Sequence, residues 1–286
     1  MSFRDWATRV LLISLMFTAL SVALLIGKIN QSKIYSTTPS NQEMTTIGSE
    51  YPQVKLQSSK NQSAKSPITP RQNVGRYRTT EAFARYRPRY EIAKVDPTNY
   101  GDRYTQDIYG VTLTNQPIIV LHETGYSADS AINFFQTPHE DESVQASYHS
   151  LIKLDGTVVY LVPPEKRAFG AANSVFESFN GVETVQTNPN LAPSVNNFAY
   201  HVSLETPPDG RGDNYIQAHS GYTEAQYHSL AWLIAQSQIP EDRITTHQQV
   251  DRSGQKVDPV SFDFDKFLVL LNTYRQISPV YRAQSN

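Results

Sequence analysis

The sequence contains no cysteine among its 286 residues, which excludes disulfide bonds and metal sites built on thiolate ligands. Lack of cysteine suits an oxidising compartment without establishing one. The net charge is only -2 at pH 7, so the chain as a whole lacks the positive charge that binds phosphates, and no nucleic-acid partner is expected. Hydrophobic residues make up 39% of the chain, which suffices for one domain of about 150–200 residues with extensions.

Long apolar runs are scarce, and the strongest one lies at the N-terminus. Val10 to Gly27 contains 18 residues without a charge, and as a helix it would span about 27 Å, close to the roughly 30 Å of a bilayer core. A buried soluble helix, a signal peptide cleaved within Ala19–Ala23 and an uncleaved signal anchor are the alternatives. The run continues through Leu24–Ile26, past the cleavage sites, which favours a transmembrane anchor over residues 1–28. Both the anchor and the signal peptide export the chain. The anchor would hold it at the inner membrane with the remainder in the periplasm or cell-wall space.

Two segments of different composition follow. Residues 29–74 are rich in Ser, Thr, Gln, Asn and Pro and poor in aromatics, so they are expected to form a disordered linker. Residues 75–114 form a Tyr/Arg-rich extension that is expected to pack its tyrosines onto the main domain. An alternative is that this stretch binds nucleic acid or an anionic polymer.

From residue 115 to residue 278 the pattern alternates between strand and helix, which predicts a mixed central β-sheet flanked by helices, with a tail over residues 279–286. Asp155-Gly156 predicts a tight hairpin, and Thr223 with Gln226 predicts a capping box. The polar stretch over residues 174–194 is expected to be a long loop. The other expected elements are strands over 117–122, 147–154, 157–162, 196–204 and 244–246, and helices over 127–135, 223–234 and 262–274.

Three candidate metal ligands lie far apart in the chain. His122 and His247 each end a predicted strand, and Asp258 follows eleven residues after His247. A catalytic zinc takes three protein N, O or S ligands and keeps its fourth position for water. Wide separation in sequence is typical of a site assembled across a sheet. The residues therefore predict a mononuclear hydrolytic metal centre.

These residues fall within short motifs that together resemble a known family. The motifs are Ile119-Val120-Leu121-His122, Ser147 to Thr157, Gln226 to Leu233, Thr246-His247 and Lys256-Val257-Asp258-Pro259. In order and spacing, the region from about Pro117 to Leu270 resembles the type-2 N-acetylmuramoyl-L-alanine amidases. This superfamily includes the peptidoglycan recognition proteins and the phage amidase lysozymes.

The resemblance implies a Zn²⁺ ion held by His122, His247 and Asp258. It also implies cleavage of the amide bond between N-acetylmuramic acid and L-alanine in peptidoglycan or its fragments. Lys256 matches a lysine that faces the zinc and stabilises the oxyanion, and Tyr148 matches a tyrosine at the metal. A surface lysine and an ordinary strand aromatic remain the alternatives for these two residues.

The chain departs from the family pattern in two places. Ser203 stands where one branch has a catalytic glutamate, and strand alternation places His201, Ser203 and Glu205 on one face. Glu205 is therefore a candidate general base, and His201 and Ser203 are candidate substrate contacts. Between Ala168 and Ser174 many relatives carry a substrate-facing histidine that this chain lacks, and Asn173 is a candidate replacement.

The sequence thus favours an exported, membrane-anchored zinc amidase that works as a monomer on peptidoglycan or muropeptides. The first alternative is a non-catalytic muropeptide-binding module tethered to the membrane, because some members of the superfamily keep the groove without the metal. The second is a structural tether in which the Tyr/Arg-rich extension and the linker are the active parts.

Overall fold

The computed structural model describes residues 75–179, 181–212 and 216–285. The predicted N-terminal anchor and the predicted linker lie outside the described residues and stay predictions. Among the residues described, no helix is both long enough and apolar enough to cross a membrane.

A six-stranded mixed sheet forms the centre of the fold, in the order β11-β4-β10-β5-β6-β2. The β5–β6 pair is antiparallel, and the other four pairs are parallel. The mixed sheet with flanking helices confirms the predicted fold class. The strands are β2 (Tyr90–Ile92), β4 (Ile118–Glu123), β5 (Ser150–Ile152), β6 (Val158–Tyr160), β10 (Ala199–Leu204) and β11 (Ile244–Thr246).

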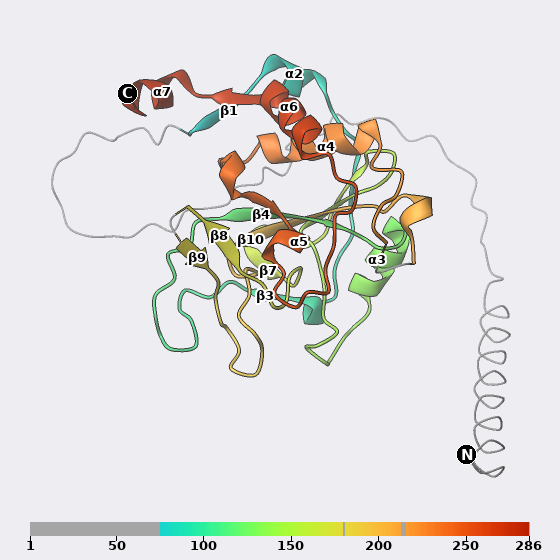
Figure 1. Cartoon of the computed structure of the whole chain (residues 1–286), viewed down its shortest axis with the longest axis vertical. Helices are drawn as coiled ribbons and strands as arrows, with labels where there is room; N and C mark the ends of the chain where they lie inside the picture. Colours follow the sequence, from blue (N-terminus) through green and yellow to red (C-terminus); the bar gives the residue numbers. More distant parts are fainter. Residues whose placement is uncertain (1–74, 180, 213–215, 286) are drawn as a thin grey trace, which may run out of the picture. The chain divides into compact units, whose positions relative to one another are not determined.

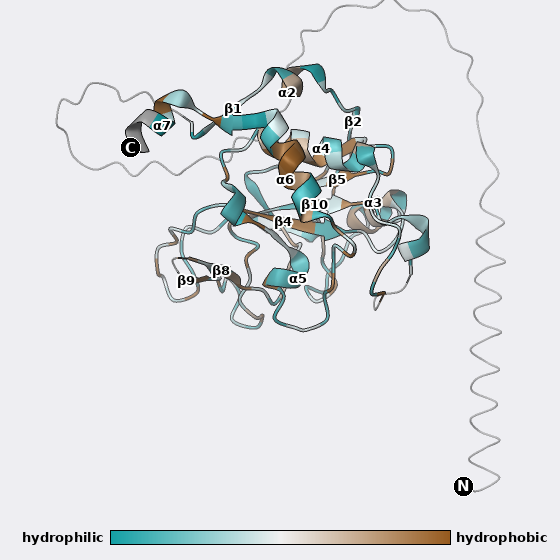
Figure 2. Cartoon of the chain, turned by 45° about the horizontal axis from the view of Figure 1, so that its top comes forward, coloured by the Kyte–Doolittle hydropathy of each residue, from teal (hydrophilic) through white to brown (hydrophobic). Residues whose placement is uncertain are grey.

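Helices α4 (Glu224–Ala235) and α6 (Phe264–Tyr274) cover one face of this sheet (Figure 1). Side chains alternate between the two faces of a strand, so β4 and β10 each send every second residue toward these helices. Figure 2 shows the hydrophobic residues of α4 and α6 beside the sheet. Burying each leucine or isoleucine there contributes about 1.5–3 kcal/mol. The core on this face includes Ile119, Leu121, Val202, Leu204, Leu230, Leu233, Phe267 and Leu271.

Local signals set the ends of these helices. Thr223 and Gln226 form the predicted capping box at the start of α4, with each side chain bonded to the other residue's backbone N–H. Asp263 caps α6 through the backbone N–H of Lys266. Gly156 turns the β5–β6 hairpin with a positive φ of 83°, as the Asp-Gly pair predicts.

The opposite face of the sheet is covered by shorter elements and loops. Ile118, Val120 and Ala199 pack there with Phe176 and Val250 in a second apolar cluster. Phe176 begins a hairpin of β8 (Phe176–Ser178) and β9 (Gly181–Glu183), and Val250 ends α5 (His247–Val250). The region predicted as a loop over residues 174–194 therefore contains a hairpin. Its strands of three residues each are too short to give a clear alternating pattern.

Helix α3 (Ala128–Gln136) begins at the predicted cap Ser127 and buries Phe135. A two-stranded sheet pairs β3 (Tyr100–Asp102) with β7 (Lys166–Ala168). Other short elements are α7 (Pro279–Ser285) and 3-10 turns at Pro97–Asn99, Pro208–Gly210 and Glu241–Arg243.

The N-terminal part of the described chain contacts the helical layer. Strand β1 (Tyr77–Thr79) pairs antiparallel with β12 (Arg275–Ile277), and α2 (Glu81–Arg85) follows it. Phe83 of α2 stacks on Trp232 of α4 with ring centroids 5.3 Å apart. The Tyr86 hydroxyl lies 2.9 Å from Oγ of Ser229. These contacts place aromatic residues of the predicted extension against α4.

Arg103 joins the same extension to the sheet. Its guanidinium donates to the carbonyl oxygens of Asn197 at 2.7 Å and Ala199 at 2.9 Å, and to that of Pro164 at 3.1 Å. Burial, with the charge of Arg167 as the next cause, lowers the pKa of Arg103 to about 10, so the group stays a cation at neutral pH. A buried cation that is satisfied by carbonyl dipoles holds the extension to the start of β10.

Candidate metal centre

His122 comes from the end of the central strand β4. Alternation along β4 places Ile118, Val120 and His122 on the face turned away from α4 and α6. The His122 side chain is fully buried, and its Nδ1 has no hydrogen-bond partner among the described residues. A buried polar atom without a partner is costly unless it binds something else. The position of His122 on β4 therefore places one imidazole nitrogen, without a hydrogen-bond partner in the part of the chain that the structure describes, at the end of the sheet.

His247 is the first residue of α5, directly after the end of β11. Thr246 and Gln249 form a capping box that starts the helix at this point, so the imidazole is fixed where strand and helix meet. Asp258 lies on the following loop, and its carbonyl accepts the backbone N–H of Gln248 at 2.9 Å. The backbone N–H of Glu123 points at Oδ2 of Asp258, 3.4 Å away.

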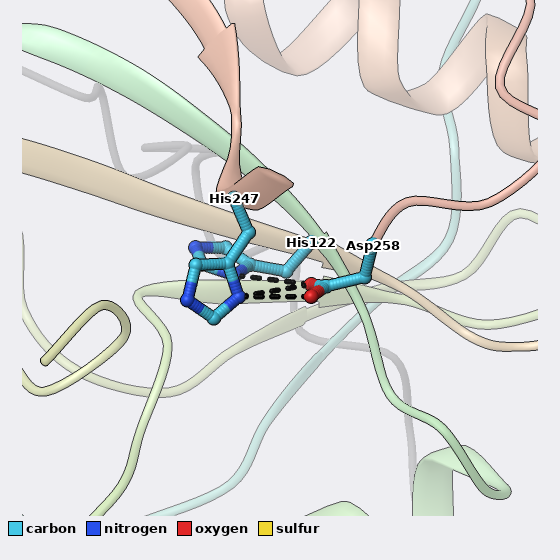
Figure 3. A group of neighbouring side chains, drawn as sticks. All are labelled: His122, His247 and Asp258. Carbon is cyan, nitrogen blue, oxygen red and sulfur yellow. Dashed lines mark hydrogen bonds and ion pairs between the residues drawn. The ribbon is translucent and has the colours of Figure 1, made fainter. Parts of the chain in front are cut away.

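Figure 3 shows the three side chains converging from β4, α5 and the loop. Nδ1 of His247 lies 2.9 Å from Oδ1 of Asp258, and Nδ1 of His122 lies 3.5 Å from Oδ2. One ligand atom from each residue lies within 4.8 Å of the others. The structure therefore brings together the three residues that the sequence proposed as ligands, although their role as ligands stays a prediction.

The electrostatics of this cluster favour a cation. Burial alone would raise the pKa of Asp258, but the imidazoles of His247 and His122 hold it well below its usual range, so the carboxylate is charged. Burial lowers the pKa of His122 to about 4, with the charge of His247 as the next cause, so His122 is neutral at pH 7. Neutral imidazoles and an ionised carboxylate are the protonation states in which these groups bind metal.

Tyr148 and Lys256 lie beside the cluster. The Tyr148 ring is 4.8 Å from the His122 ring between centroids, and burial raises the pKa of its hydroxyl, followed by the charge of Asp258. Lys256 is exposed, and its charge contributes to lowering the pKa of His122. The carboxylate of Asp251 accepts the backbone N–H groups of Gln255 and Lys256 at 3.1 and 3.3 Å and so shapes the loop that carries the lysine.

The three residues proposed on β10 and just after it are buried. His201 and Ser203 are 0% exposed, so both lie beneath the surface, which argues against the predicted contact with substrate. Glu205 accepts the N–H groups of Ala128 and Leu154 and pairs with Arg211 at 2.9 Å. Its carboxylate is thereby committed to joining α3 to the sheet, which argues against a role as general base. Glu205 follows the last residue of β10, so strand alternation no longer fixes the face on which its side chain lies.

A buried cluster that the sequence did not reveal lies next to the ligands. Nε2 of His219 lies 3.1 Å from Oε2 of Glu123, and the Tyr222 hydroxyl donates to the same oxygen. Nδ1 of His219 accepts the N–H of Gly221, so the proton of the neutral ring lies on Nε2 and is donated to Glu123. Glu123 and His219 are 96 positions apart in the sequence, and no local pattern signals their contact.

A cavity of about 480 Å³ is lined in part by Phe169, Ala172 and Asn173. Arg167 in its wall has its guanidinium 4.9 Å from the Tyr104 ring and 5.1 Å from the Phe169 ring. Asn173 also lines the cavity, and its role in binding substrate stays a prediction. Tyr104 belongs to the predicted extension, so that part of the chain contributes a wall of the cavity.

His149 packs behind the metal-ligand cluster and is fully buried. Its Nδ1 accepts the backbone N–H of His201 at 2.9 Å, and its Nε2 lies 3.1 Å from the carbonyl oxygen of Lys166. Burial, with the charge of Arg103 as the next cause, lowers its pKa to about 3. The folded protein therefore keeps this imidazole neutral at pH values where the unfolded chain takes up a proton.

This difference predicts a contribution of His149 to the acid sensitivity of the fold. Its folded pKa lies below the unfolded value of about 6.5, so its contribution is complete above that value and is lost as the pH falls toward 3. For His149→Asn we expect the free energy of unfolding to fall less steeply between pH 5.5 and 4.5, by about 1.4 kcal/mol per pH unit. Urea unfolding with a chelator present measures both slopes. An unchanged slope in His149→Asn would contradict the assignment.

Two imidazoles and a carboxylate at the end of a mixed α/β sheet define a candidate mononuclear metal centre. The family model described as N-acetylmuramoyl-L-alanine amidase matches residues 114–261, which is more than half of the chain. The chain therefore belongs to this amidase family, which confirms the resemblance seen in the sequence.

Solved structures of amidases resemble the chain at low identity. A selenomethionine derivative of AmpD is 24% identical, with 64% of this chain and 94% of that chain covered and a TM-score of 0.43. AmpD of Citrobacter freundii is 21% identical, with 64% and 90% covered and a TM-score of 0.38. AmiD of E. coli, solved with anhydro-N-acetylmuramic acid-L-Ala-D-gamma-Glu-L-Lys, is 16% identical, with 60% and 65% covered and a TM-score of 0.42. No curated protein matches the chain.

Proposed function

We propose that this protein is a zinc-dependent N-acetylmuramoyl-L-alanine amidase that hydrolyses the bond between N-acetylmuramic acid and L-alanine in peptidoglycan or its fragments. The observation that carries the proposal is the meeting of His122, His247 and Asp258 at the end of the sheet, within the region that matches the amidase family.

The donor set fits zinc. Zinc bonds to nitrogen and oxygen of about 2.0–2.1 Å place tetrahedral ligand atoms about 3.3 Å apart. The separations of 2.9 and 3.5 Å between the imidazole nitrogens and the carboxylate oxygens of Asp258 bracket this value. The unpartnered Nδ1 of His122 is the atom that such an ion would satisfy. With no cysteine in the chain, the nitrogen and oxygen ligands also suit a catalytic ion better than a structural one.

A zinc ion bound here would activate water and polarise the scissile carbonyl. Tyr148 and Lys256 would then supply a hydrogen bond and a positive charge beside the ligands. Tyr148 keeps its proton because burial raises its pKa, so its hydroxyl is available to donate a hydrogen bond beside the ligands. Exposed Lys256 supplies a positive charge near enough to help lower the pKa of His122, and this charge is suited to stabilise the negative charge that develops on the carbonyl oxygen.

For substrate binding, we propose that the cavity whose lining includes Tyr104, Arg167, Phe169 and Asn173 receives part of a muropeptide. Its walls combine aromatic rings, amides and a guanidinium, which suits a ligand that carries both sugar or peptide amides and carboxylates.

For the place of action, we propose an exported protein that is anchored in the inner membrane, with the amidase domain in the periplasm or cell-wall space. The uncharged run from Val10 to Gly27 supports this proposal. Residues 29–74, if flexible, would let the domain reach peptidoglycan roughly 35–40 Å from the membrane.

The deciding experiment is mass spectrometry of purified peptidoglycan and of soluble muropeptides after digestion. We expect release of stem peptides with a free N-terminal L-alanine, loss of this release after chelation, and its return with Zn²⁺. A zinc-loaded protein that binds peptidoglycan but frees no N-terminal alanine would overturn the enzymatic proposal and leave the muropeptide-binding module. Chelation without effect would overturn zinc dependence alone.

A further inference from the structure

His201 occupies the centre of the sheet, directly behind a proposed ligand. It lies on β10 opposite Val120 in the parallel register with β4, and its side chain is fully buried. Its Nδ1 lies 2.9 Å from Nε2 of His122, and the two ring centroids are 5.1 Å apart. His201 is therefore the hydrogen-bond partner of the His122 nitrogen that faces away from Asp258.

The tautomers of both rings follow from this contact. Nδ1 of His122 faces Asp258, and this nitrogen must be free of a proton to bind a cation. The single proton of neutral His122 then lies on Nε2 and is donated to Nδ1 of His201. His201 has no carboxylate partner, so its buried ring is neutral and carries its own proton on Nε2. That Nε2 has no hydrogen-bond partner among the described residues, so no other contact opposes this assignment.

Packing prevents the His201 ring from turning away. A Cβ atom placed on Gly170 would lie 2.5 Å from Cγ and from Nδ1 of His201, so the glycine backbone lies directly against the ring. The backbone of His201 is bonded to His149 on both sides, through its N–H at 2.9 Å and its carbonyl at 3.0 Å. Residue 170 must be glycine for the imidazole to fit.

We propose that His201 is a positioning residue for the metal centre: it accepts the Nε2 proton of His122 and thereby keeps Nδ1 of His122 deprotonated and aimed at the ion. This inference rests on the proposed zinc site and does not depend on the reaction catalysed there. Hydrogen-bond partners of histidine ligands typically contribute about 10–100-fold to metal affinity.

A pair of variants separates this role from simple space filling. In His201→Asn the side-chain oxygen retains an acceptor near the position of Nδ1. In His201→Leu a side chain of similar size has no acceptor. Zinc affinity of the full chain is measured by competition with a chromophoric chelator, and circular dichroism and thermal melting confirm folding. We expect zinc binding about 10–100-fold weaker in His201→Leu, with most of the loss restored in His201→Asn. Equal affinity in the two variants would overturn the proposal and leave His201 as a packing residue.

The wild-type protein supplies a test that does not depend on the folding of a variant. Long-range ¹H–¹⁵N NMR of the histidine-labelled protein reports which ring nitrogen carries the proton. We expect His122 and His201 both to be protonated at Nε2, and a proton on Nδ1 of either ring would overturn the proposal. A wild-type protein that binds no zinc would overturn the proposed function, while a protein that binds zinc with His122 in the other tautomer would overturn this inference alone.

Discussion

Asp258→Ala is expected to remove zinc binding and amidase activity together while the protein stays folded. The Asp258 carboxylate is the only anionic side chain among the three proposed ligands, and it contacts both imidazoles. Its loss leaves two imidazoles and no anionic ligand, and we expect zinc affinity to fall well beyond the roughly 10–100-fold typical of losing a partner behind a ligand. The sheet and its apolar cores do not involve this side chain. Metal analysis, muropeptide digestion and thermal melting give the three readouts.

Asp265→Ala is the matched control for this experiment. Asp265 is exposed on the first turn of α6, on the same chain segment but without contact to the ligands, so its variant should retain zinc and activity. An unfolded Asp258→Ala would show that the metal has a structural role. Full activity in Asp258→Ala would remove the aspartate from the site.

Lys256→Met is expected to lower kcat by about 10²–10³-fold while the zinc content stays unchanged. Loss of one group that stabilises a developing oxyanion typically has this effect. The lysine is exposed at the cluster and does not ligate, so its removal leaves all three ligand atoms in place. Methionine keeps most of the unbranched side chain and removes the ammonium group with its charge. Steady-state kinetics with a defined muropeptide, together with metal analysis, measures both quantities.

Lys266→Met serves as the control, because Lys266 pairs with Glu224 on the helical side of the domain. Its variant should keep the wild-type kcat. A Lys256→Met enzyme whose KM rises at constant kcat would assign the lysine to substrate binding, and unchanged kinetics would leave it as a surface residue.

The sequence predicted the parts of the fold that depend on neighbouring residues. The apolar run before His122, the Asp155-Gly156 turn and the capping box at Thr223 are local signals, and each element forms where expected. His122 and His247 were predicted to end strands, and they lie at the end of β4 and directly after β11. Their convergence with Asp258 was predicted from the residue types and their wide separation, and the family resemblance supported it. The parallel order of β11, β4 and β10 is not encoded locally.

The parts that the sequence did not predict depend on contacts between distant residues. Glu205 accepts the backbone N–H of Ala128 and forms an ion pair with Arg211. His219 contacts Glu123 from a separate segment of the chain. Strand alternation predicts the face of β10 that carries His201, but not how deeply the side chain is buried. For this reason His201 was proposed as a substrate contact. The loops that bury this face belong to remote parts of the chain.

The hydrogen bonds of Arg103 also bear on how much of the chain is needed for folding. A fragment trimmed to the stretch shared with the amidase family would begin near residue 114. It would lose the cation that satisfies the carbonyls of Asn197 and Ala199, and would uncover Trp232 where Phe83 now stacks. We therefore expect the smallest autonomous folding unit of this chain to extend beyond the family-matched region and to include Phe83 and Arg103.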